Sequence, residues 1–188
     1  MTVQLTKGGN ANLTKDHPGL NKLRVGLGWD ANANGKPFDL DVHAFMLTAL
    51  GKVRTEKSAV YFNNLKSEDG SVSHSGDDRT GSAPGDDETI TIDLAAVPAD
   101  VTTIAIGLDI FEGDKNGTTF GQVKNAGARV YNDADNTKLA EFDLTEDAGA
   151  TTTMVFAEIY RKDAEWKVRA LGTPVTGGLA ALYHQYGL

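Results

Sequence analysis

A run of acidic residues in the middle of the chain has the composition of a metal-binding loop. Five carboxylates fall within twelve residues, and glycines stand at positions 76, 81 and 85 of the same segment. The acids are Asp77, Asp78, Asp86, Asp87 and Glu88. Like charges held this close repel one another and raise each other's pKa, and a bound divalent cation removes that cost. The chemistry that this run indicates is cation binding.

The available donors in this run are hard oxygens. They are carboxylates, the Thr80 hydroxyl and carbonyls beside flexible glycines such as Gly85. Calcium accepts about six to eight such oxygens in adaptable geometry, magnesium demands stricter octahedra, and zinc prefers histidine or cysteine. His74 is the one histidine near the run, and the chain has no cysteine, so calcium is the predicted ion. A merely solvated acidic loop is the alternative reading of such a charge run.

A second carboxylate pair precedes an apolar segment. Asp39 and Asp41 are two residues apart and would point to the same side of a strand that continues to Leu47. If they meet the acidic loop, two adjacent calcium ions are expected, and the Asn64 side chain could add an amide oxygen. A solvent-exposed strand end is the simpler alternative. Residues 30–41 also approach the pattern of an EF-hand loop, but strands are predicted on both flanks where an EF-hand needs helices, so a hairpin loop is expected there.

Strands are predicted to position these acids. Apolar and polar residues alternate with period two through Ile90, Ile92 and Leu94, and through 104–110. A short strand at 72–74 precedes the acidic loop, and the strand starting at Thr89 follows it. About ten such segments at short spacing predict an all-β fold, a two-sheet β-sandwich with a short C-terminal helix over 178–186. Residues 1–188 are expected to form a single domain.

Composition and charge exclude several functions. Without cysteine the chain has no disulfide, thiolate metal site or thiol nucleophile. A net charge of −8 argues against nucleic acid as a partner, because phosphate binding needs a basic face. Seven acids against one base in residues 67–88 account for most of this excess. The first residues lack the pattern of a secretory signal, so a cytoplasmic protein is expected.

Several short motifs, spread over nearly the whole chain, resemble those of the TerD family. They lie at residues 5–10, 25–30, 38–41, 61–65, 74–81, 85–88, 120–123, 142–144 and 177–179. The resemblance implies a calcium-binding β-sandwich that acts in resistance to tellurite and other stresses. Carried over position by position, it implies these ligands: Asp39, Asp41, Asn64, Asp77, Asp78, Asp86, Asp87 and Glu88. Residues 110–117 fit the pattern least well, and nothing is carried onto them.

The leading functional hypothesis is a non-enzymatic calcium-binding protein of a stress-response system, with other proteins of that system as partners. A calcium-dependent module that binds a ligand or the inner face of the membrane is the second hypothesis. A carboxylate-based hydrolase is the third, since paired acids on a sandwich could act on glycosides. It is disfavoured because 7% of the residues are aromatic and the histidines are scattered.

Overall fold

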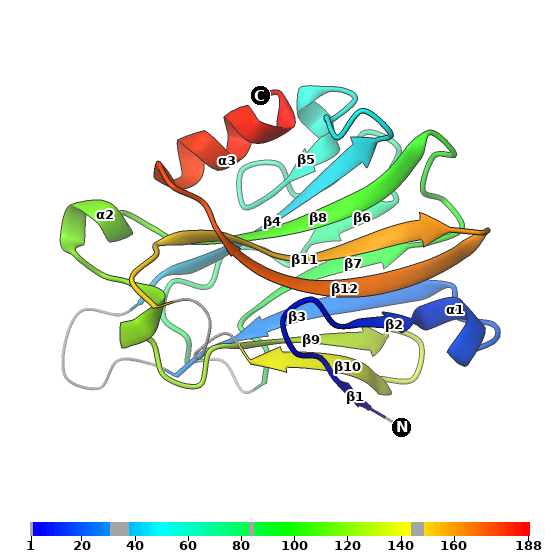
Figure 1. Cartoon of the computed structure of the whole chain (residues 1–188), viewed down its shortest axis with the longest axis horizontal. Coiled ribbons are helices and arrows are strands. Elements are labelled where there is room, and N and C mark those ends of the chain that lie inside the picture. Colours follow the sequence, from blue (N-terminus) through cyan, green and yellow to red (C-terminus); the bar gives the residue numbers. More distant parts are fainter. Residues whose placement is uncertain (1, 31–37, 83–84, 144–148) are drawn as a thin grey trace.

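The computed structural model describes residues 2–30, 38–82, 85–143 and 149–188. Two six-stranded sheets stack face to face, and short helices lie at the ends and on one outer face (Figure 1). The predicted β-sandwich is therefore confirmed, with twelve strands in the described residues where about ten were expected. The EF-hand-like segment falls largely outside the described residues.

The first sheet, called sheet A, brings distant parts of the chain together. Its order is β1-β10-β9-β3-β7-β6, with β1 parallel to β10 and the other pairs antiparallel. The strands are β1 (Val3–Gln4), β10 (Lys138–Asp143), β9 (Gly127–Asn132), β3 (Lys22–Gly28), β7 (Glu88–Asp93) and β6 (Val72–His74).

The second sheet, called sheet B, is antiparallel throughout, in the order β2-β12-β11-β8-β4-β5. Its strands are β2 (Asn10–Asn12), β12 (Glu165–Pro174), β11 (Thr153–Lys162), β8 (Val101–Ile110), β4 (Leu40–Thr48) and β5 (Ala59–Val60). The helices are α1 (Leu13–Asp16), α2 (Gly113–Asn116) and α3 (Gly178–Tyr186), with single 3-10 turns at Glu56–Ser58 and Phe120–Gln122.

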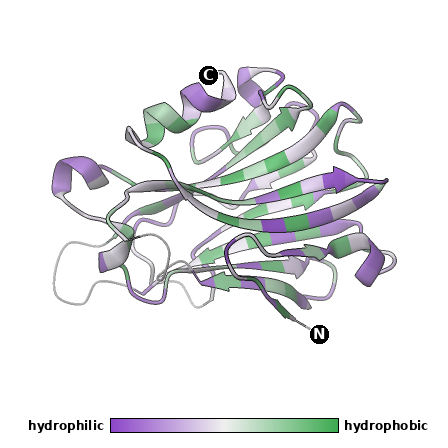
Figure 2. Ribbon diagram, viewed as in Figure 1, coloured by the Kyte–Doolittle hydropathy of each residue, from purple (hydrophilic) through white to green (hydrophobic). Residues whose placement is uncertain are grey.

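Alternating side chains build the core between the sheets. In β7, Glu88, Ile90 and Ile92 are buried while the residues between them are partly exposed. The same alternation appears as bands of colour along several strands in Figure 2. Glu88 thus lies on the inward face of β7, which otherwise carries the core residues Ile90 and Ile92.

Strand β4 is buried on both faces for two different reasons. Its inner side chains, such as Val42, join the main core, whereas Phe45 belongs to a second apolar cluster with Leu182 and Tyr186 of α3. Helix α3 covers the outer face of sheet B at this point (Figure 1). Asp41 and His43 share the outward side of β4 with Phe45. No described helix is both long and apolar enough to cross a membrane.

Candidate metal site

Three carboxylates from separate elements converge at the edge of the sandwich. Asp41 comes from β4 of sheet B, Glu88 from β7 of sheet A, and Asp77 from the loop between β6 and β7. One oxygen of each lies within 4.8 Å of the others. These three residues are called the carboxylate cluster below. Asp41 and Glu88 are 4% and 0% exposed, whereas Asp77 is exposed, so the cluster opens to solvent on the loop side.

Backbone groups fix the Glu88 carboxylate. Strand β5 pairs with β4 at Ala44 and Phe45, so Val42 lies beyond that pairing. One oxygen of Glu88 accepts the Val42 N–H at 2.9 Å. The other oxygen accepts the Asp78 N–H at 3.2 Å. One side chain of sheet A therefore ties together β4 of sheet B and the start of the acidic loop.

His74 lies directly beside this carboxylate. Its Nδ1 accepts the Gly76 N–H at 2.9 Å, which leaves the ring proton on Nε2. Nε2 is 3.5 Å from a Glu88 oxygen, too long and poorly aligned for a hydrogen bond. The Nε2–H group of His74 therefore lies close to the Glu88 carboxylate without forming a hydrogen bond with it.

Asp41 is surrounded by negative charge. Burial, together with the nearby carboxylates of Asp109 and Glu88, raises the pKa of Asp41 to about 8. Asp109 stands directly across from Asp41 on the paired strand β8. Ionising Asp41 is thus costly in the protein alone, and a bound cation would offset that cost.

Asp39 lies next to the cluster, and the positive charge of Arg79 partly compensates its negative charge. Burial raises the pKa of Asp39, and Asp77 raises it further, while Arg79 lowers it. The Arg79 guanidinium is 3.5 Å from Asp39 and 4.0 Å from Asp77. The other oxygen of Asp39, Oδ1, is buried and has no hydrogen-bond partner in the described part of the chain. A buried, unpartnered carboxylate oxygen beside three further carboxylates fits a hard cation such as calcium.

Asp78 and Thr80 shape the loop. One oxygen of Asp78 accepts from the Thr80 N–H at 2.8 Å, the Thr80 hydroxyl at 2.9 Å and the Gly81 N–H at 3.2 Å. Such local hydrogen bonds are typical of aspartate in turns. In the described structure these two residues hold the turn that follows Asp77.

The remaining candidates lie outside the cluster. Asp86 pairs with Arg129 at 2.6 Å, and an oxygen of Asp87 accepts the Trp29 N–H at 3.0 Å. The Asn64 amide donates to the Ala59 carbonyl at 2.6 Å. Gly85 is exposed, with a positive φ of 107°. Metal ligation by these four residues is a prediction, as are calcium binding at the carboxylate cluster and a second calcium ion.

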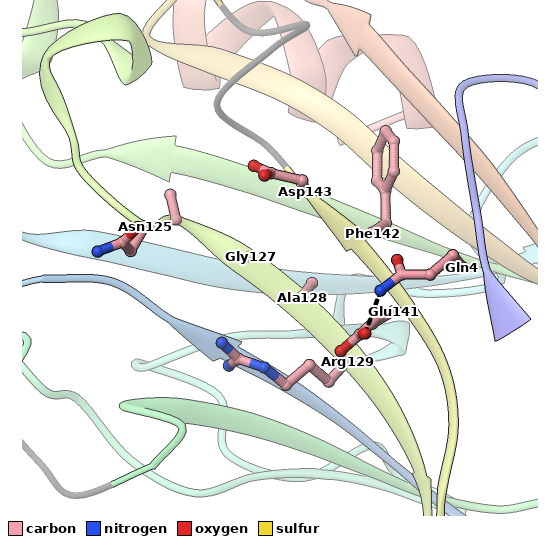
Figure 3. A pocket seen from close by; sticks show the side chains of 9 residues that line it. Gln4, Asn125, Gly127, Ala128, Arg129, Glu141, Phe142 and Asp143 are labelled. Carbon is pink, nitrogen blue, oxygen red and sulfur yellow. Dashed lines mark hydrogen bonds between the residues drawn. The ribbon is translucent and has the colours of Figure 1, made fainter. Parts of the chain in front are cut away.

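A polar pocket of about 290 Å³ opens on sheet A between β9 and β10 (Figure 3). Arg129, Glu141 and Gln4 line it, and Gln4 donates a hydrogen bond to Glu141. None of the three cluster residues lines this pocket. The Arg129–Asp86 pair links the pocket to the acidic loop.

Sequence reasoning missed two residues of the site. His74 begins the motif at residues 74–81, but the sequence alone does not show that its ring lies beside Glu88. Asp109 gave a clearer signal, because it is the one charged residue of the strand Val101–Ile110. Its role depends on pairing with Asp41, which local sequence does not show.

A specific effect on stability is predicted for a substitution in the turn after Asp78. Gly81 has a φ of +62°, and a Cβ there would lie 2.2 Å from Nε1 of Trp29, whose N–H donates to the Phe38 carbonyl. Gly81→Ala is expected to lower the free energy of unfolding by about 2–4 kcal/mol through backbone strain and displacement of Trp29. Gly117→Ala is the matched control, since Gly117 has a φ of +66° but nothing within 4 Å. Equal losses in urea unfolding would contradict the contact with Trp29.

Comparison with known proteins identifies the family. The TerD domain model matches residues 1–186. The chain is 49% identical over 189 residues to "Tellurium resistance protein TerD" of Alcaligenes sp, covering 100% of this chain and 98% of that protein. It is 43% identical over 190 residues to "General stress protein 16U" of Bacillus subtilis, covering 100% and 98%.

Solved structures agree with this assignment. A homologue of telluride resistance protein, SCO6318 from Streptomyces coelicolor A3(2), superimposes with a TM-score of 0.72 at 25% identity, covering 88% of this chain and 96% of that one. The protein SAV2460 gives a TM-score of 0.74 at 26% identity, covering 88% and 95%. The chain therefore belongs to the TerD family.

Proposed function

We propose that this protein is a non-enzymatic calcium-binding component of a tellurium-resistance and stress-response system. The convergence of Asp41, Asp77 and Glu88 from two sheets and one loop is the observation that carries the calcium part. The names of its relatives, which refer to tellurium resistance and general stress, support the physiological part.

The cluster residues and Asp39 would hold the ion. Calcium would supply positive charge that lets the buried carboxylates ionise, and it would join β4, β7 and the acidic loop. Since Glu88 already connects both sheets through its backbone contacts, the ion would stabilise the same edge of the sandwich. A structural or regulatory role follows more readily than a chemical one.

The burial of Asp41 and Glu88 favours a non-enzymatic protein. A general acid or base must come within hydrogen-bond reach of a substrate proton. Glu88 is fully buried and both of its oxygens accept backbone N–H groups. The proposal also includes other proteins of the same stress-response system as partners and a cytoplasmic location.

Thermal unfolding tests calcium binding directly. At calcium about 100-fold above its Kd, ligand linkage adds about 2.7 kcal/mol, which corresponds to a rise in Tm of roughly 5–10 °C for a chain of this size. The protein is first stripped with EDTA, and magnesium at the same concentration is the control. An unchanged Tm, or an equal rise with magnesium, would contradict a calcium site.

A further inference from the structure

The imidazole of His74 is held beside the Glu88 carboxylate by strand pairing. His74 is the last residue of β6 and pairs with Ile90 of β7, so Glu88, two residues before Ile90, is its diagonal neighbour. The side chains of His74 and Glu88 are both 0% exposed. The two strands therefore keep a ring nitrogen and a carboxylate next to each other and away from solvent.

One hydrogen bond decides which nitrogen of this ring carries the proton. Nδ1 accepts the Gly76 N–H at 2.9 Å, so the ring N–H lies on Nε2. Gly76 has a φ of +111°, a conformation that favours glycine, and this bend turns its N–H back toward His74. A histidine that binds a metal offers the lone pair of a ring nitrogen. Since the lone pair of Nδ1 is taken by Gly76 and Nε2 carries the proton, His74 is a donor beside Glu88 and not a metal ligand.

The Nε2–H group of His74 is buried close to an acceptor but makes no hydrogen bond. Nε2 lies 3.5 Å from Oε2 of Glu88 and has no hydrogen-bond partner among the described residues. Buried polar groups without a partner are costly and uncommon in native proteins. An ionised carboxylate offers about four lone pairs, and the N–H groups of Val42 and Asp78 use one on each oxygen of Glu88. Glu88 can therefore accept a further N–H and still bind a cation.

We propose that His74 is a positioning residue of the calcium site, which donates its Nε2–H to the Glu88 carboxylate when the ion is bound. This role rests on the proposed calcium function and adds to that site a residue that is not a ligand. A bound cation keeps Glu88 ionised, and N–H donors form shorter and stronger hydrogen bonds with a charged carboxylate than with a neutral acceptor. Together with the N–H groups of Val42 and Asp78, His74 fixes the orientation of the Glu88 oxygens.

Two substitutions separate the roles of the two ring nitrogens. His74→Asn places an amide oxygen near the position of Nδ1, so it can accept the Gly76 N–H but offers no donor to Glu88. His74→Gln places an amide nitrogen near the position of Nε2 and retains that donor. In calorimetric titrations of the full chain at pH 8, calcium affinity should fall by about tenfold or more in His74→Asn and stay within about threefold of wild type in His74→Gln. His184→Asn changes an exposed histidine of α3 and is the matched control, with wild-type affinity expected. An equal loss in both His74 variants, or no loss in either, would overturn the positioning role.

NMR of the histidine rings in the wild-type protein gives a second measurement that does not require a variant to fold. In 15N-labelled protein, the Nε2 proton signal of His74 should move downfield when calcium is added, because a hydrogen bond forms, while Nδ1 stays unprotonated. The ring signals of His184 should not change. Calcium binding with an unchanged His74 signal would overturn the positioning role and leave the calcium site in place. If calcium did not bind the wild-type protein at all, both the calcium site and the role of His74 would be wrong.

Discussion

Asp41→Asn is expected to make the metal-free protein more stable and to remove most of its calcium affinity. At pH 8 to 9 the wild-type protein must keep a buried carboxylate beside Asp109 and Glu88. An amide of the same shape avoids this charge, so the free energy of unfolding should rise by about 1–3 kcal/mol. Calcium affinity should fall about 100-fold, because a charged ligand is lost.

Urea unfolding with and without calcium measures both effects. Glu112→Gln is a matched control, since it removes the same charge from an exposed residue that pairs with Lys115. The control should leave stability and calcium affinity nearly unchanged. If Asp41→Asn destabilised the metal-free protein and retained wild-type calcium affinity, Asp41 would not be the strained ligand described here.

The stability of the metal-free protein is expected to fall as pH rises from 5 to 8. The pKa of Asp41 is raised from 3.8 to about 8 in the folded state. Between these values the folded protein keeps a proton that the unfolded chain has released. Because the folded state then binds more protons, the free energy of unfolding decreases with pH, by on the order of 3 kcal/mol over this window.

Denaturant unfolding at pH 5, 6, 7 and 8 in EDTA checks this slope. Asp41→Asn should flatten it, which separates Asp41 from all other titrating groups. Calcium should bind more tightly as pH rises, since it competes with the Asp41 proton. A wild-type stability that is constant or rises over the window, with the variant parallel to it, would contradict the raised pKa.

The strand pattern could be predicted from the sequence because each face of a strand has one environment. Ile90 and Ile92 alternate with polar residues since β7 has one face in the core. In β4 the alternation is lost because the core covers one face and α3 covers the other. The C-terminal helix was predicted over 178–186 and is found at Gly178–Tyr186.

The site was predictable in composition but not in arrangement. Acids that are close in sequence have side chains that point in different directions. Asp86 reaches Arg129 of β9, while Glu88, at the first position of β7, turns into the sandwich. Asp41 joins Glu88 only because sheets A and B meet at this edge. These are long-range contacts, and no local spacing rule distinguishes a ligand from a residue that holds a turn, as Asp78 does.

Calorimetric titration of calcium into EDTA-stripped protein at pH 8 tests the central claim most directly. The carboxylate cluster predicts saturable binding of micromolar affinity or tighter in the wild-type protein, which Asp41→Asn and Asp77→Asn each weaken by about 100-fold. The stoichiometry decides between one ion and the two expected from the sequence. No heat of binding, or the same affinity in all three proteins, would contradict a calcium site at Asp41, Asp77 and Glu88.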